Sequence, residues 1–91
     1  MPGQETERGK ACILVVEDDS SISDVVCSTL SGSGFVCTPA YSGTEAKLLV
    51  ESNELFDLAI CDLMLPGMPG EDVVALIRSQ GAMPILVTSA K

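Results

Sequence analysis

Hydrophobic residues gather in four short segments of the chain, at 11–16, 35–40, 55–61 and 84–89. The first segment is an unbroken apolar run that ends abruptly in three acidic residues. Unbroken rather than alternating apolarity is typical of strands that are buried on both faces, as in parallel sheets. We therefore expect four strands over these ranges, the second of them weakened by Pro39.

Between these segments, apolar residues recur at the spacing of amphipathic helices. Serine or threonine near the start of a helix and glycine or asparagine at its end are typical boundaries. Acidic residues at the start of the third helix interact favourably with the helix dipole. The expected limits are Ser20 or Ser21 to Gly32, Thr44 to Asn53, and Glu71 to Gln80.

Strands and helices therefore alternate, which predicts parallel strands joined by right-handed crossovers in a doubly wound α/β sheet. Ligands of such folds bind beyond the carboxyl ends of the strands, at the point where the strand order reverses. The residues expected to meet there follow the first, third and fourth strands: Glu17, Asp18, Asp19, Asp62, Thr88 and Ser89.

The chain of 91 residues is long enough for one small domain. Its hydrophobic content of 46% is well above that of disordered chains, so we expect a globular fold. Residues 1–10 are polar and contain proline, glycine and mixed charge, and we expect a flexible N-terminal arm there. Residues 11–91 form the expected domain.

The acidic residues at the strand ends predict a metal site. Carboxylates in one crevice repel each other unless a cation neutralises them. Because the chain has no histidine and no cysteine cluster, these donors favour Mg²⁺ or Mn²⁺ over zinc. The hydroxyl of Thr88 would donate a hydrogen bond to a phosphoryl oxygen. A metal site with such a donor beside it indicates phosphoryl transfer to a carboxylate. Each acid taken alone is explained equally well as a solvated turn residue, and Asp19 as a helix cap.

Charge and cysteine usage exclude several other classes of protein. The net charge of −8 disfavours direct binding to nucleic acid or to acidic membranes. The four cysteines lack CxxC spacing, which favours small buried residues of a protein in the reducing cytoplasm over the alternative of a redox or metal site. The longest apolar run, residues 11–16, is too short for a membrane span.

Three segments resemble the receiver (response regulatory) domain of response regulators in two-component phosphorelay systems. They are residues 13–19, 57–70 and 84–90, in the order and at the spacing of that family. The most specific part is the motif D-x-x-x-P-x-x-x-G, which falls on Asp62, Pro66 and Gly70. The resemblance runs from about Cys12 to the last residue.

This resemblance implies a role for each residue of the predicted site. Asp62 would accept the phosphoryl group of a phosphohistidine, carried by a sensor histidine kinase or a phosphotransfer protein. The ligands of Mg²⁺, with Mn²⁺ as the alternative, would be Glu17, Asp18, Asp62 and the backbone carbonyl of Met64. Thr88 would be the switch hydroxyl, and Ser89 the adjoining small residue. Such a domain is not an enzyme, beyond slow hydrolysis of its own phosphoryl group.

The resemblance also implies a flavodoxin-like receiver fold with strand order 2-1-3-4-5. The chain stops at Lys91, directly after the fourth predicted strand. We therefore expect a partial receiver, with strand five, the last two helices and the family's phosphate-binding lysine outside this chain. Lys91 does not match that lysine. The exposed edge of residues 84–89 predicts self-association, and a longer parent chain would carry an output domain.

Three alternatives belong to other functional classes. A receiver that acts only as a protein-interaction module would keep the fold without the phosphoryl chemistry. A phosphohydrolase of the haloacid dehalogenase type would need a second aspartate where Met64 stands. A flavodoxin-like nucleotide binder is disfavoured, because residues 17–19 would repel a phosphate.

Overall fold

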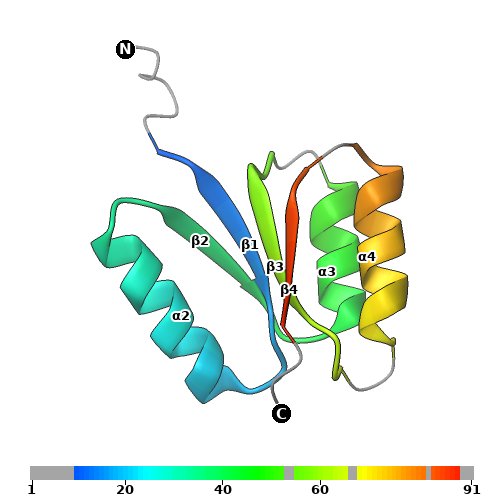
Figure 1. The fold of residues 1–91 in the computed structure, drawn as a ribbon, viewed down its shortest axis with the longest axis horizontal. Coiled ribbons are helices and arrows are strands. Elements are labelled where there is room, and N and C mark those ends of the chain that lie inside the picture. The colour runs from blue at the N-terminus through cyan, green and yellow to red at the C-terminus, as the bar shows by residue number, and fades with distance from the viewer. Residues whose placement is uncertain (1–9, 53–54, 66–67, 82, 89–91) are drawn as a thin grey trace.

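The computed structural model describes residues 10–52, 55–65, 68–81 and 83–88, over which strands and helices alternate (Figure 1). The strands are β1 (Cys12–Val16), β2 (Val36–Ala40), β3 (Leu58–Asp62) and β4 (Ile85–Thr88). The helices are α2 (Ser20–Gly32), α3 (Gly43–Glu51) and α4 (Gly70–Ser79). The predicted order of elements is confirmed. The expected arm at residues 1–10 lies outside the described residues, apart from Lys10.

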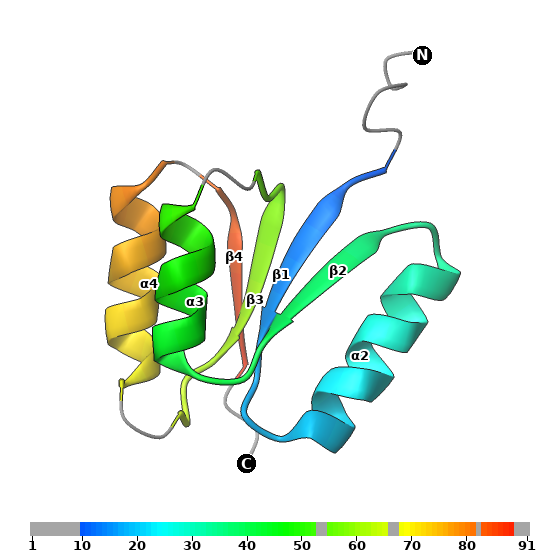
Figure 2. The ribbon, with the colours of Figure 1, turned by 180° about the vertical axis from the view of Figure 1, so that it is seen from behind.

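The described strands form one parallel sheet in the order β2-β1-β3-β4. Helix α2 lies on one face of this sheet, and α3 and α4 lie side by side on the other (Figures 1 and 2). The chain moves outward from β1 to β2 and then crosses back to β3, so the strand order reverses between β1 and β3. The doubly wound sheet predicted from the alternation is therefore confirmed, and its switch point lies between these two strands.

The main hydrophobic core lies between the sheet and the helices α3 and α4. Fully buried residues of β1, β3 and both helices meet there. They include Leu14, Val16, Ala46, Ala59, Val73 and Ile77. The opposite face is less completely covered, since Ile22 and Val25 of α2 are 42% and 66% exposed. In the described part of the chain, no helix is both long and apolar enough to cross a membrane.

Helix α2 begins one residue earlier than a serine cap would place it. The side chain of Asp19 is the N-cap, and its Oδ1 accepts hydrogen bonds from the backbone N–H groups of Ser21 (2.9 Å) and Ile22 (3.2 Å). A carboxylate is a stronger acceptor than a hydroxyl for these N–H groups at the positive end of the helix dipole. The expectation of a Ser20 or Ser21 cap was therefore wrong, while the alternative reading of Asp19 as a cap is confirmed.

Helix α3 is also capped upstream of its expected start at Thr44. The hydroxyl of Ser42 accepts a hydrogen bond from the N–H of Glu45 (3.1 Å). The carboxylate of Glu45 reaches back to the N–H of Tyr41 (2.7 Å). This reciprocal arrangement resembles a capping box, and it starts the helix at Gly43. The expected end at Asn53 lies outside the described residues.

Strand β3 starts at Leu58, three residues later than its apolar run suggested. Asp57 sets this boundary, because its carboxylate accepts from the N–H of Cys12 (2.8 Å) and its own N–H donates to the carbonyl of Cys12 (2.7 Å). These two bonds tie the entrance of β3 to the start of β1. The strand also extends one residue further than expected and includes Asp62.

Strand β4 is an edge of the described sheet. The carbonyls of Pro84 and Thr88 accept hydrogen bonds from Ala59 and Leu63 (both 3.0 Å). Since backbone groups alternate in direction along a strand, those of Ile85 and Val87 face away from β3. The side chains of Leu86 and Val87 are 55% and 44% exposed. The expected strand residue Ser89 lies outside the described residues.

Candidate metal centre

The acidic residues that follow β1 differ in their surroundings. Glu17 is buried, and its backbone N–H donates to the carbonyl of Ala40 at the end of β2 (3.0 Å). Its carboxylate Oε2 accepts a hydrogen bond from the N–H of Asp19 (3.1 Å). Asp18 is exposed at the rim of the site. Hydrogen bonds to the ends of β2 and α2 thus hold the Glu17 carboxylate beyond the carboxyl end of β1.

Asp62 is the last residue of β3 and is only 2% exposed. Its Oδ1 accepts a hydrogen bond from the backbone N–H of Met64 (2.9 Å), which orients the carboxylate. Asp62 aligns with Thr88 across the β3–β4 pair, and the N–H of Leu63 donates to the carbonyl of Thr88 (3.0 Å). The segment after β3 is therefore held against the end of β4.

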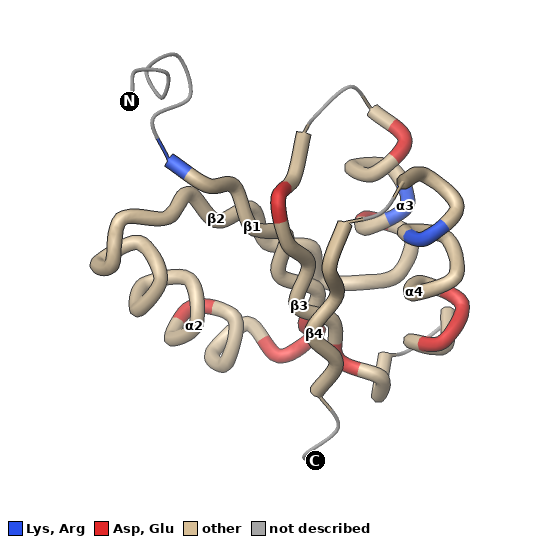
Figure 3. The backbone as a smooth tube through the Cα atoms, turned by 45° about the horizontal axis from the view of Figure 1, so that its top comes forward, with Lys and Arg blue, Asp and Glu red and all other residues tan. Residues whose placement is uncertain are grey.

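These elements bring three carboxylates together at the switch point of the sheet. Oxygen atoms of Glu17, Asp18 and Asp62 all lie within 4.8 Å of one another. The described lysine and arginine positions lie away from this acidic end (Figure 3). Clustered carboxylates, two of them buried, repel each other strongly without a cation. Oxygen donors alone fit a hard divalent cation such as Mg²⁺, which typically takes one or two carboxylates together with water and phosphate oxygens.

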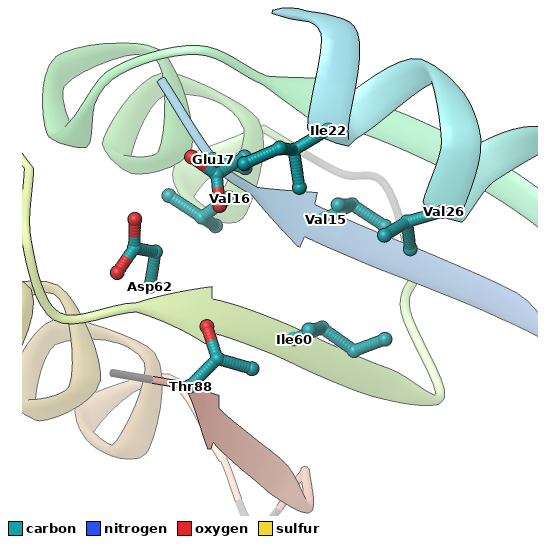
Figure 4. A pocket seen from close by; sticks show the side chains of 8 residues that line it. All are labelled: Val15, Val16, Glu17, Ile22, Val26, Ile60, Asp62 and Thr88. Atoms are coloured by element: carbon teal, nitrogen blue, oxygen red, sulfur yellow. The ribbon is translucent and has the colours of Figure 1, made fainter. Parts of the chain in front are cut away.

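A cavity of about 220 Å³ opens beside the carboxylates, on the face of the sheet that α2 covers. Figure 4 shows the hydroxyl of Thr88 on the same side of the sheet as the carboxylates of Glu17 and Asp62. The other walls of the cavity are aliphatic side chains of β1, α2 and β3: Val15, Val16, Ile22, Val26 and Ile60. The cavity is thus polar at the strand ends and apolar further down the sheet.

Cys61 precedes Asp62 but is not a second nucleophile of this site. Its side chain is completely buried in the core on the other face of the sheet. Burial, together with a smaller contribution from the nearby Asp62 carboxylate, raises the pKa of the Cys61 thiol to about 11. The thiol therefore stays protonated and unreactive at neutral pH.

The structure brings most of the predicted site residues together. Glu17, Asp18 and Asp62 form the carboxylate cluster, and Thr88 lines the adjoining cavity. Asp19 contributes to the helix cap rather than to the cluster. The loop after β3 adds the N–H of Met64, a donor that no sequence pattern indicated. Coordination through the Met64 carbonyl stays a prediction. Ser89 and Pro66 lie outside the described residues.

Gly70 allows α4 to begin directly against the carboxyl end of β3. Its N–H donates to the carbonyl of Leu63 (3.3 Å). A Cβ atom at position 70 would overlap the Cα of Leu63 and lie 2.9 Å from the carbonyl oxygen of Asp62. Because these are backbone atoms of the site, a larger residue here would have to displace the loop that orients Asp62.

Comparison with protein families gives a match to the response regulator receiver domain over residues 13–91. The chain is 40% identical over 79 residues to the DNA-binding response regulator MtrA of Mycobacterium tuberculosis strain H37Rv. It is 39% identical over 79 residues to the regulatory protein VanRc of Enterococcus gallinarum. Each alignment covers 87% of this chain and 34% of the relative, so the chain spans about a third of the length of these relatives.

Solved structures match the fold closely. The receiver domain of the Francisella response regulator 1452 superimposes with a TM-score of 0.82 at 28% identity, covering 89% of this chain and 67% of that one. The non-phosphorylated HemR receiver domain of Leptospira biflexa gives a TM-score of 0.83 at 30% identity, covering 90% of this chain and 66% of that one. These structures have the same flavodoxin-like arrangement of strands and helices that the sequence predicted.

We expect Gly70→Ala to lower the free energy of unfolding by about 1–3 kcal/mol, because the added methyl group meets backbone atoms that cannot move independently. Urea denaturation followed by circular dichroism measures the change. The matched control is Gly32→Ala, where nothing lies within 4 Å of an added Cβ and the substitution should be neutral or slightly stabilising. Equal stability of the two variants would show that the close approach at Gly70 is unimportant.

Proposed function

This chain belongs to the response regulator receiver domain family, and we propose that it is a phospho-accepting signalling domain in which Asp62 receives the phosphoryl group. One observation carries the proposal: the buried Asp62 carboxylate lies at the end of β3, within 4.8 Å of oxygens of Glu17 and Asp18. This is the arrangement that a carboxylate needs when it must meet both a metal ion and a phosphoryl group.

The proposed reaction joins one carboxylate oxygen of Asp62 to phosphorus while the P–N bond of a phosphohistidine breaks. The electron pair of that bond stays with the imidazole nitrogen, which leaves and takes up a proton from solvent. The products are an acyl phosphate on Asp62 and a free histidine in the donor. The donor class is a sensor histidine kinase or a phosphotransfer protein, as the family implies. Because the phosphoryl group remains on the chain itself, the domain is a substrate rather than an enzyme.

Each neighbouring group has a defined part in this scheme. The Met64 N–H holds Asp62 in one orientation through Oδ1. Glu17, Asp18 and Asp62 would hold Mg²⁺ together with the Met64 carbonyl, and the bound ion would neutralise charge on the carboxylates and the phosphoryl oxygens. The hydroxyl of Thr88, beside the same cavity, would donate a hydrogen bond to a phosphoryl oxygen and thereby connect phosphorylation to the end of β4.

Three wider features belong to the same proposal. The relatives include DNA-binding response regulators of which this chain spans about a third, which supports an output domain in a longer parent chain. Free thiols at all four cysteines are compatible with a reducing compartment, and we propose the cytoplasm. The acidic charge of this segment argues against direct contact with nucleic acid.

We expect Asp62→Asn to abolish labelling by a small phosphodonor such as acetyl phosphate in the presence of Mg²⁺. Intact-mass measurement should show one added phosphoryl group on the unmodified chain, and hydroxylamine should remove it because acyl phosphates are cleaved by this nucleophile. The matched control is Asp19→Asn, which keeps a competent helix cap and should still be labelled.

Hydroxylamine-labile label retained in Asp62→Asn would move the acceptor to another carboxylate. Failure of the unmodified chain to become labelled, with its fold intact by circular dichroism, would instead favour the alternative of a receiver that acts only as an interaction module.

We expect Asp18→Asn to weaken Mg²⁺ binding by roughly tenfold or more, since one of the few anionic ligands is lost. A Mg²⁺ titration followed by amide NMR signals of Glu17, Asp62 and Met64 measures the dissociation constant. Asp19→Asn again provides the control, because Asp19 caps α2 outside the carboxylate cluster. An unchanged Mg²⁺ affinity in Asp18→Asn would place the metal elsewhere.

The exposed edge of β4 supports a further part of the proposal, namely self-association of this chain through that strand. We expect the chain to show concentration-dependent dimers in sedimentation velocity, and Val87→Lys to suppress them, because a lysine on an edge strand opposes strand pairing. Leu48→Lys is the control, since Leu48 is 65% exposed on α3, away from the edge. A monomer at every concentration would contradict this prediction.

A further inference from the structure

Helix α2 packs on β2 through a narrow stripe of small and medium side chains. Of its thirteen residues, those that are buried or half-buried are Ser23, Val26, Cys27 and Leu30. They follow one another at spacings of three, one and three positions, which places them on the same side of the helix. Cys27 therefore lies on the face of α2 that is turned toward the sheet.

Cys37 lies on the matching face of β2. It aligns with Ile13 of β1, and two residues further along, Pro39 aligns with Val15. Val15 lines the same cavity as Val26 of α2, so it points to the α2 side of the sheet. Because alternate residues of a strand point to the same face, Cys37 points to that side as well.

Cys27 of α2 and Cys37 of β2 are thus both turned toward the space between this helix and the sheet. Burial raises the pKa of the Cys37 thiol above its ordinary value of 9.0, and charge and hydrogen-bond interactions with Cys27 raise it further. Both side chains are half-buried and so keep some access to solvent. The Cys37 thiol is therefore protonated at neutral pH. Cys27 and Cys37 lie ten positions apart in the sequence and on different elements.

The other two cysteines are not part of this pair. Cys12 is adjacent to Ile13 on β1 and therefore points to the opposite face of the sheet. Cys61 is completely buried among the residues that pack against α3 and α4. The sheet itself thus separates Cys12 and Cys61 from the space between α2 and β2.

We propose that Cys27 and Cys37 form a reversible disulfide that ties α2 to β2, a modification site separate from the carboxylate cluster. The oxidant is a small-molecule disulfide of the glutathione class. The thiolate of one cysteine attacks this disulfide and forms a mixed disulfide as one glutathione leaves. The thiolate of the second cysteine then attacks the protein sulfur of that intermediate and releases the second glutathione. Two protein thiols lose two electrons and two protons, and one glutathione disulfide becomes two glutathione thiols.

The position of the pair gives the disulfide a structural consequence. It closes a short loop through the end of α2 and the turn that leads into β2, which restricts the unfolded chain. In the chain-entropy picture, closing a loop of roughly ten residues lowers the equilibrium constant for unfolding by up to about a hundredfold. Such a bond would stabilise the less completely packed face of the sheet under oxidising conditions. An excess of reduced glutathione would cleave it again.

To test this, the full 91-residue chain is equilibrated with glutathione disulfide, and the remaining thiols are blocked with N-ethylmaleimide. Intact-mass measurement then gives the number of N-ethylmaleimide adducts and hence of free thiols. Chymotryptic peptides then identify the bond, because Phe35 lies between the two cysteines. We expect the monomeric chain to lose two of its four thiols, as Cys27 linked to Cys37, and to regain them with dithiothreitol. Cys12→Ser should behave in the same way, whereas Cys27→Ser and Cys37→Ser should form no intramolecular bond. The oxidised chain should also unfold at a higher urea concentration than the reduced chain.

The proposal is overturned if all four thiols survive a large excess of glutathione disulfide while circular dichroism shows a folded chain. It is equally overturned if the bond maps to Cys12 or Cys61, or if it occurs only between chains. If Cys37→Ser impairs folding, peptide mapping of the chain without substitutions still shows whether Cys27 and Cys37 are linked. Cys37→Ala provides a second variant for that case.

Discussion

The parallel pairing of β1 with β2 on one side and β3 on the other is the constraint on which the rest of this structure depends. It surrounds β1 with other strands and buries residues 13–17 almost completely. The same pairing brings the carboxyl ends of β1 and β3 to one edge of the sheet. Glu17 and Asp62 therefore meet because the backbone register requires it, in spite of their mutual repulsion.

Two buried carboxylates at such a position are electrostatically unfavourable unless nearby groups compensate their charge. Part of that compensation is built into the backbone, since N–H groups of Asp19 and Met64 donate to Glu17 and Asp62. A hard divalent cation would compensate more of it, which is the physical reason for proposing a metal ion and phosphoryl chemistry at this site. Asp19, the last of the three acids that follow β1, has a separate role, because its carboxylate stabilises the start of α2.

The two faces of the sheet differ in how well they are packed, and this difference organises the remaining features. The face beneath α3 and α4 holds the dense core, including the unreactive Cys61. The face beneath α2 holds the cavity beside Thr88 and the pair of half-buried thiols. The proposed phosphoryl transfer and the proposed disulfide both lie on the α2 face, which is less completely covered than the face beneath α3 and α4.

The sequence by itself determined the element order, the parallel sheet and the acids at its switch point, because continuous apolar runs, helical periodicity and strand-end carboxylates are local signals. It placed several boundaries wrongly, since caps at Asp19 and Ser42 and the bonds of Asp57 to Cys12 depend on which groups meet in space. Only the tertiary structure decided that Met64 donates its N–H to Asp62, and that Cys27 and Cys37 are on the sides of α2 and β2 that are turned toward each other. No spacing rule signals such a pair, because strand register and helix rotation, which are global properties of packing, bring its members together.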